Sequence, residues 1–128
     1  MMADIVYLFG YSLLGTNQFE QLIPLVKNQL TKDIKVSVVL LHDAVVGTSN
    51  KGTTPDALKE LLDFAFQLKN MGNVTGIEPT VGLHVQVLTE DLEARGFTAE
   101  NLIPRLEPIT YSKLVDILDE TGKIVSWM

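Results

Sequence analysis

A histidine and an aspartate stand side by side at the end of an apolar run, at His42 and Asp43. Imidazole and carboxylate groups transfer protons in many enzymes, so the pair raises the hypothesis of a hydrolase in which His42 works with Asp43 or Ser49. Neighbouring strand residues point to opposite faces, however, and the sequence has no G-x-S-x-G motif. We favour a His42 that bonds a backbone carbonyl or lies at a subunit contact, and an Asp43 that braces its own loop.

A second polar group, from Gly47 to Thr54, has the sequence GTSNKGTT and precedes a helix start. Its hydroxyl groups, its backbone N–H groups and Lys51 have the chemistry of a small-anion site, although a solvated loop is the simpler interpretation. The segment from Gly10 to Thr16 has two glycines before a helix but lacks the lysine of a phosphate-binding loop. A stand-alone domain that binds a small anion or a nucleotide between these loops is the alternative hypothesis for the function.

The stretch from Leu83 to Phe97, LHVQVLTEDLEARGF, passes from a strand to a short helix with almost no loop. Thr89 is expected to cap this helix, Asp91 to lie near the positive end of its dipole, and Gly96 to end it. Ligands gather at the carboxyl ends of strands in open α/β sheets, so Thr89 is a candidate ligand-binding residue, together with His42, Asp43 and Lys51. Arg95 is able to pair with Asp91 four residues earlier.

Three segments carry a resemblance to a known family. VQVLTEDLEARGFT resembles the strand and helix of the DsrE/DsrF/DsrH sulfur-relay superfamily, in particular of its DsrH (TusB) branch. VVLLHDAVVGT, with Asp43 in the matching place, and ITYSKLVDILDETGKIVSWM resemble two further segments of that branch. The resemblance implies a DsrE-like fold, trimers or hexamers with cysteine-bearing DsrE- and DsrF-like subunits, and a part in sulfur transfer for tRNA thiolation or sulfur metabolism.

The chain contains no cysteine. Persulfide carriage, thiol catalysis and Cys-ligated zinc all require a thiolate, so these activities are excluded for this chain. The sulfur-carrying branches of the superfamily place their cysteine near the end of the strand in which this sequence has Leu88 and Thr89. We therefore expect a non-catalytic subunit without metal or cofactor, in which four residues have structural or interfacial roles: Asp43, Asp91, Arg95 and Trp127.

Length and charge limit the remaining possibilities. The 128 residues suffice for a single domain, residues 1–128, that folds without a metal or disulfides. A formal charge of −6 provides no positive field for a phosphate backbone, so direct nucleic-acid binding is not expected. No apolar run approaches the ~20 residues that span a bilayer, and no signal sequence is apparent, so we expect a cytoplasmic protein.

The pattern of apolar residues predicts alternating strands and helices. Strands are expected at 3–9, 34–41, 83–88, 105–109 and 123–128. Helices are expected after cap residues Asn17, Thr54, Thr89 and Thr110, with a short turn at 98–101 and with a kink or a start at Pro24. This alternation predicts an α/β fold: a single-domain three-layer sandwich with a mostly parallel five-stranded sheet and helices on both faces.

Several residues outside the predicted core suggest partner contacts. Phe64 and Phe66 flank the buried stripe of their helix. Residues 70–82 show no sustained period and predict a long connection that forms an extra hairpin or a partner-binding arm. Trp127 is expected in a groove or a subunit interface, and His84 at a sheet edge or packed, not as a metal ligand. The last helix is expected to bury Tyr111, Leu114, Val115 and Leu118.

Overall fold

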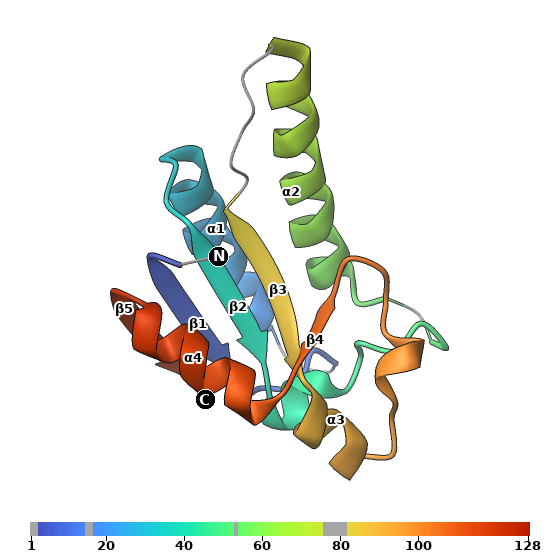
Figure 1. The fold of residues 1–128 in the computed structure, drawn as a ribbon. Helices are drawn as coiled ribbons and strands as arrows, with labels where there is room; N and C mark the ends of the chain where they lie inside the picture. Colours follow the sequence, from blue (N-terminus) through green and yellow to red (C-terminus); the bar gives the residue numbers. More distant parts are fainter. Residues whose placement is uncertain (1–2, 15–16, 53, 76–81) are drawn as a thin grey trace.

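The computed structural model describes residues 3–14, 17–52, 54–75 and 82–128. Its centre is a five-stranded sheet with the strand order β4-β3-β2-β1-β5, and every neighbouring pair is parallel. The strands are β1 (Ile5–Phe9), β2 (Val36–Leu40), β3 (Leu83–Leu88), β4 (Glu107–Ile109) and β5 (Lys123–Trp127). Helices cover both faces of the sheet, which confirms the predicted α/β three-layer fold (Figure 1).

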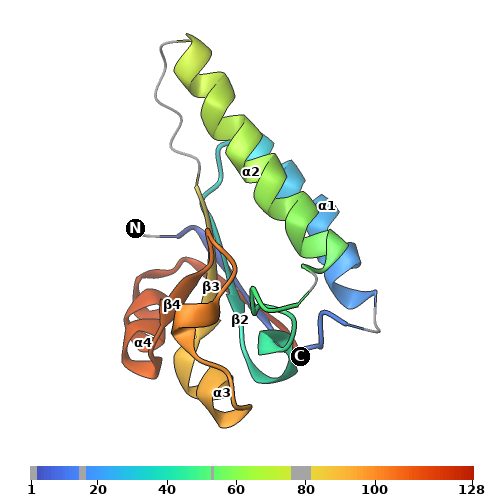
Figure 2. The same cartoon turned by 90° about the vertical axis from the view of Figure 1, so that its right-hand side faces the viewer.

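The two faces are covered unequally. Helices α1 (Gln18–Thr31) and α2 (Asp56–Thr75) lie together on one face, and α4 (Tyr111–Glu120) lies on the other (Figure 2). The chain steps from β1 to β4 across the sheet, and α4 then returns it to the opposite edge, where β5 pairs with β1. One ten-residue helix therefore covers a face that five strands form.

The α4 face has the smaller core. Leu114 and Ile117 are buried there against Val6 and Val39, which point to this face from the two central strands. The predicted buried stripe is wrong in part, because Tyr111 and Val115 are 49% and 53% exposed. A helix that packs Ile117 against the sheet turns Val115 away from it, since residues two apart do not share a helix face.

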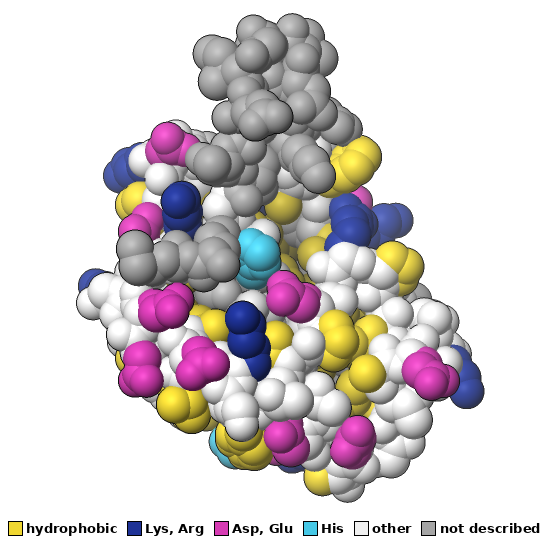
Figure 3. Space-filling model, viewed as in Figure 1, with side chains coloured by type: hydrophobic (Ala, Val, Ile, Leu, Met, Phe, Trp, Pro, Cys, Tyr) yellow, Lys and Arg dark blue, Asp and Glu magenta, His cyan; other side chains and the backbone are white. Residues whose placement is uncertain are grey.

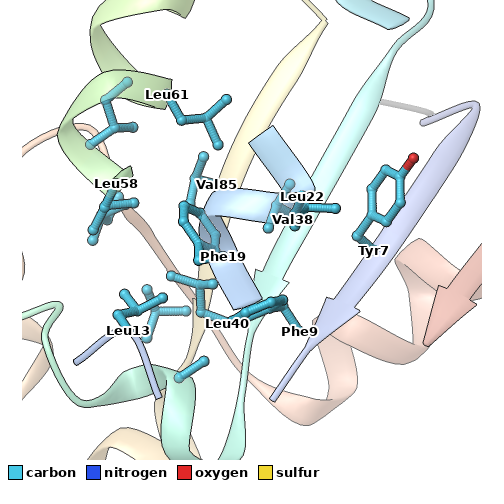
Figure 4. Packing of buried hydrophobic residues seen from close by; sticks show 14 of the residues in the cluster. Tyr7, Phe9, Leu13, Phe19, Leu22, Val38, Leu40, Leu58, Leu61 and Val85 are labelled. Atoms are coloured by element: carbon cyan, nitrogen blue, oxygen red, sulfur yellow. The ribbon is translucent and has the colours of Figure 1, made fainter. Parts of the chain in front are cut away.

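The opposite face has the larger core (Figure 4). Tyr7 and Phe9 of β1 alternate with residues of the α4 face, as the two-residue period of a strand requires. The Phe9 and Phe19 rings pack edge to face at 5.2 Å. The predicted stripe of α1 is buried as expected, and its members are Phe19, Leu22, Ile23, Val26 and Leu30. Helix α1 runs without interruption through Pro24.

Some predicted helix ends and connections differ from the structure. Thr89 is the first residue of α3 (Thr89–Ala94) instead of its cap, and Leu88 occupies the cap position without a side-chain hydrogen bond. Helix α2 continues to Thr75, so residues 70–75 are helical instead of irregular, whereas the predicted hairpin at 76–81 lies outside the described residues. Thr110 caps α4 as predicted and accepts from the N–H of Lys113 at 3.3 Å.

The helix starts at Asn17 and Thr54 also depart from simple side-chain capping. Asn17 holds the cap position of α1 but its side chain makes no cap hydrogen bond. At α2 the carbonyl of Pro55 accepts from the N–H of Lys59 at 3.0 Å, so the helix begins one residue later than predicted. Within the described part of the chain, no helix is long and apolar enough to cross a membrane.

The two edges of the sheet are different. β4 has three residues and contains the exposed Pro108, whose ring nitrogen carries no hydrogen. β5 has five residues, Lys123–Trp127, and no proline. Both assignments agree with the sequence-based expectation of a brief edge strand near Pro108 and a closing strand at Trp127.

Candidate functional site

The carboxyl ends of the strands carry most of the residues that the sequence singled out. His42 and Asp43 begin the short helix η1 (His42–Val45) directly after β2. Thr89, Asp91 and Arg95 belong to α3 or its end, directly after β3. β2 and β3 are parallel neighbours, so η1 and α3, which follow them, meet at the end of the sheet where the strands finish.

Asp91 fixes the position of His42. Its Oδ2 accepts a hydrogen bond of 2.7 Å from the backbone N–H of His42, and it lies 3.8 Å from Nδ1 of the imidazole. His42 has a φ of +50°, in the left-handed region that few side chains tolerate. A carboxylate that is 15% exposed thus holds a strained backbone position, while the imidazole is 56% exposed.

Arg95 links the same two segments. Its Nη2 lies 3.2 Å from Oδ1 of Asp43, and its Nη1 donates to the backbone carbonyl of Asp91 at 3.3 Å. The expected side-chain pair of Arg95 with Asp91 is therefore wrong, because the Asp91 carboxylate is already engaged by His42. The Asp43 side chain is 72% exposed and pairs with Arg95 instead of bracing its own loop.

The side chains of His42 and Asp91 do not share a hydrogen bond. The 3.8 Å between Nδ1 of His42 and Oδ2 of Asp91 exceeds the length of a hydrogen bond. The Asp91 oxygen nearest to the ring also accepts from backbone N–H. Among the described residues, no three His, Cys, Asp or Glu side chains are placed to hold a metal ion.

The polar loop at Gly47 uses its hydrogen-bonding groups internally. The Thr48 hydroxyl is buried and donates to the carbonyl of Val45 at 2.7 Å. The N–H of Asn50 donates to Asn101 O at 2.6 Å, and that of Lys51 to Ser49 Oγ at 3.2 Å. These bonds tie the loop to η2 (Ala99–Asn101) and engage one hydroxyl and two backbone N–H groups of its described part.

The two loops of the alternative hypothesis do lie side by side, but through apolar side chains. A Cβ placed on Gly47 would meet Cβ of Leu13 at 3.4 Å and Cγ of Leu14 at 3.6 Å. Leu13 is buried, whereas Lys51 is exposed. Residues 15, 16 and 53 of these loops lie outside the described residues. The described part therefore does not build a phosphate cradle.

One part of this edge was missed by the sequence analysis. The pairing of β1 with β5 continues one residue past the end of β1, where the N–H of Gly10 donates to the carbonyl of Trp127 at 3.0 Å. A Cβ on Gly10 would lie 2.9 Å from Cγ of Met128 and 3.4 Å from Cδ2 of His42, so the side chains of Met128 and His42 approach the backbone closely at this glycine. β1 is where the connections change from one face to the other, and such a position is the usual ligand site of open α/β sheets.

Trp127 is held within its own subunit. The indole is partly buried against the larger core, and Nε1–H donates to Oε1 of Gln18 at 3.3 Å. The indole N–H thus has an acceptor within the same chain, whereas a groove around Trp127 and a contact with a partner subunit stay predictions. The ligand-binding roles suggested for His42, Asp43, Lys51 and Thr89 stay predictions as well.

Apolar side chains are also exposed at this end of the sheet. Tyr11, Leu14 and Met128, all from segments that follow β1 or β5, are 38%, 51% and 53% exposed. Aromatic residues, Met and Arg are enriched where proteins contact one another. We call this surface, made by Tyr11, Leu14, His42, Arg95 and Met128, the carboxyl-edge surface.

Comparison with known proteins agrees with the resemblance found in the sequence. The model of the family "DsrH like protein" matches residues 72–124 of this chain. These residues include β3, α3, β4 and α4, and the match confirms the resemblance to the DsrH branch. No protein with a curated description matches the chain.

Solved structures confirm the fold. The crystal structure of the ychN protein from E. coli superposes with a TM-score of 0.72 over 98% of this chain and 100% of its own, at 15% sequence identity. A protein of unknown function from Methanobacterium thermoautotrophicum, MTH1491, superposes with a TM-score of 0.65 over 98% of this chain and 99% of its own, at 14% identity. At such identities the likeness extends to the fold alone.

Proposed function

We propose that this DsrH-like chain is a non-catalytic subunit of a cytoplasmic sulfur-relay assembly. In this proposal it packs against DsrE- and DsrF-like subunits whose cysteines carry the sulfur, toward tRNA thiolation or sulfur metabolism. The chain needs no cofactor for this role and does not itself contact nucleic acid. Its contribution is a surface that positions the partner's thiol.

One observation carries the proposal: a chain with DsrH-like strands and helices has no thiol at all. The residues at the carboxyl end of β3 are Leu88, which is buried, and Thr89, which begins α3. Neither side chain forms a persulfide, since that step requires a thiolate. A role in sulfur transfer is thus left to contact with other subunits.

The carboxyl-edge surface supports such a contact. It combines exposed apolar side chains with the Arg95–Asp43 ion pair, and the Asp91 carboxylate bonds the backbone N–H of His42. A preorganised surface loses little conformational freedom on association, which favours binding. The engagement of the loop donors around Thr48 and Asn50 weighs against the small-anion alternative.

Two measurements test the proposal. The purified chain is incubated with a persulfide donor, and intact-mass spectrometry should find no added sulfur atom. The chain is then mixed with DsrE- and DsrF-like subunits from the same genome, and light scattering after size exclusion should find a hetero-oligomer. A covalently sulfurated chain, or a chain that stays alone with every such partner, would contradict the proposal.

A matched pair of variants locates the contact. Leu14→Asp places a charge on the carboxyl-edge surface, where Leu14 is 51% exposed, and should weaken assembly by about tenfold or more. Leu25→Asp places the same charge on α1, where Leu25 is 46% exposed, and should leave assembly unchanged. Equal losses in both variants would place the contact elsewhere.

A further inference from the structure

A hollow of about 320 Å³ lies on the α4 face of the sheet, away from the carboxyl-edge surface. Its floor is formed by Ser37 of β2, Gln86 of β3 and Ile117 of α4. His84 and Glu107 stand on one side, joined by a 3.1 Å contact between Nδ1 and Oε2. Ligand pockets in proteins start at about 300 Å³, so the hollow has the size of a small-metabolite site.

The floor contains a polar group that lacks a complete set of partners. Gln86 is 5% exposed, and its Oε1 accepts a hydrogen bond of 2.7 Å from the hydroxyl of Ser37, a residue that is 2% exposed. Within the described residues, the two hydrogens on Nε2 of Gln86 find no acceptor. Since no buried side-chain nitrogen or oxygen of the described residues lacks a hydrogen-bond partner, Nε2 is open to the hollow, where it can donate to water or to the acceptor atom of a ligand.

The rim of the hollow is acidic. Four carboxylates line it, from Glu107, Asp116, Asp119 and Glu120, against the single ammonium group of Lys113. Acidic side chains gather over α4 on this face (Figure 3). Asp116 and Glu120 are four residues apart on α4, so they share a helix face and repel each other when no cation is present.

We propose that this hollow binds a small organic cation that also carries a hydrogen-bond acceptor. The amine or guanidinium group lies among the carboxylates of α4, and the acceptor oxygen bonds Nε2 of Gln86. The carboxylates are spread along α4 and β4 and do not converge on one point, which favours an extended cation over a metal ion. The site is independent of the sulfur-relay proposal, because it shares no residue with the carboxyl-edge surface.

L-argininamide is the probe for this site, since it joins a guanidinium group to a carbonyl oxygen. Titration followed by amide-resolved NMR should show saturable shifts at Gln86, His84 and Asp116. L-citrullinamide replaces the cation with a neutral group of the same shape, and agmatine removes the carbonyl, so both should bind more weakly. Equal binding of L-citrullinamide, or no saturable shift with L-argininamide, would overturn the proposal.

Variants assign the binding to the hollow. Asp116→Asn with Glu120→Gln should weaken L-argininamide binding by roughly three- to tenfold, since each exposed charge contributes a modest attraction. Glu20→Gln with Glu93→Gln removes the same charge from exposed positions on α1 and α3 and should leave binding unchanged. Equal weakening in both double variants would mean that net charge alone attracts the probe and would contradict the site.

The floor is tested separately. Ser37→Ala with Gln86→Leu removes both polar partners together, so the fold should survive while the affinity gap between L-argininamide and agmatine disappears. A persistent gap would contradict the role of Gln86. The α4 variants change exposed side chains and should fold normally. They therefore still test whether the carboxylates attract the cation, even if the floor variant folds poorly.

Discussion

The carboxylate of Asp91 accepts a 2.7 Å hydrogen bond from the backbone N–H of His42, which lies 49 positions earlier in the chain. This contact joins α3 to the loop after β2 and holds His42 at a φ of +50°. Two of the segments that resemble the sulfur-relay superfamily are therefore joined by a hydrogen bond between a backbone N–H and a side-chain carboxylate.

Asp91→Ala should lower the free energy of unfolding by about 1–3 kcal/mol, because the charge-assisted hydrogen bond to His42 is lost. Asp91→Asn keeps an acceptor oxygen and should lose clearly less. Urea denaturation followed by Trp127 fluorescence measures both, since Trp127 is the single tryptophan of the chain. Equal losses in the two variants would mean that Asp91 does not act as an acceptor.

His42→Gly should leave stability unchanged or raise it by up to about 1 kcal/mol, because glycine adopts a φ of +50° without a steric cost. His42→Val should lower it by at least about 1 kcal/mol, since a β-branched side chain tolerates this region poorly. The two midpoints of thermal unfolding provide the comparison. A glycine variant less stable than the valine variant would contradict the left-handed backbone of residue 42 as the cause of the difference.

Gly82→Ala should cost about 1–3 kcal/mol, since the new Cβ would lie 2.7 Å from Cα of Lys35 and the backbone would have to move. Gly52→Ala is its control, because a Cβ there meets nothing within 4 Å. That change should be neutral or stabilise by up to about 1 kcal/mol. Guanidinium denaturation of both variants tests the close approach between β3 and the start of β2.

Ser37 and Gln86 should behave as a coupled pair. Ser37→Ala alone leaves Gln86 without its hydroxyl donor and should cost about 1–3 kcal/mol. Ser37→Ala combined with Gln86→Leu should cost less than the sum of the single changes, because no polar group is then left unpaired. A double-mutant cycle on unfolding free energies measures the coupling, and strict additivity would rule out the contact.

Much of the fold was predictable because local patterns determine it. The stripe from Phe19 to Leu30 has a helical period, and the threonine at 110 is a good cap, so α1 and α4 could be placed from the sequence. Helix α2 was expected to end earlier, since Gly72 and the polar residues around it favour a turn. Which face of α4 is buried depends on the sheet beneath it, and the helical period alone does not decide between Val115 and Ile117.

The candidate site was less accessible to sequence reasoning. The alternation of strands and helices predicts a parallel sheet, and therefore that His42 and Asp91 lie at the same end of it. It does not predict which groups their side chains bond. Arg95 had an obvious partner four residues earlier and instead pairs with Asp43, 52 positions away. A signal for the hollow was present in β3, where His84 and Gln86 alternate with apolar residues and mark one face of a central strand as polar.

The unequal strands at the two borders of the sheet restrict how it could grow. A further strand beside β4 would face three residues, one of which is a proline that donates no hydrogen bond, so this side is blunted against addition. Beside β5 a new strand would meet five consecutive residues with an intact ladder of donors and acceptors. If two chains shared one continuous sheet, the β5 strands would therefore pair with each other, and β4 would remain the edge strand of each chain.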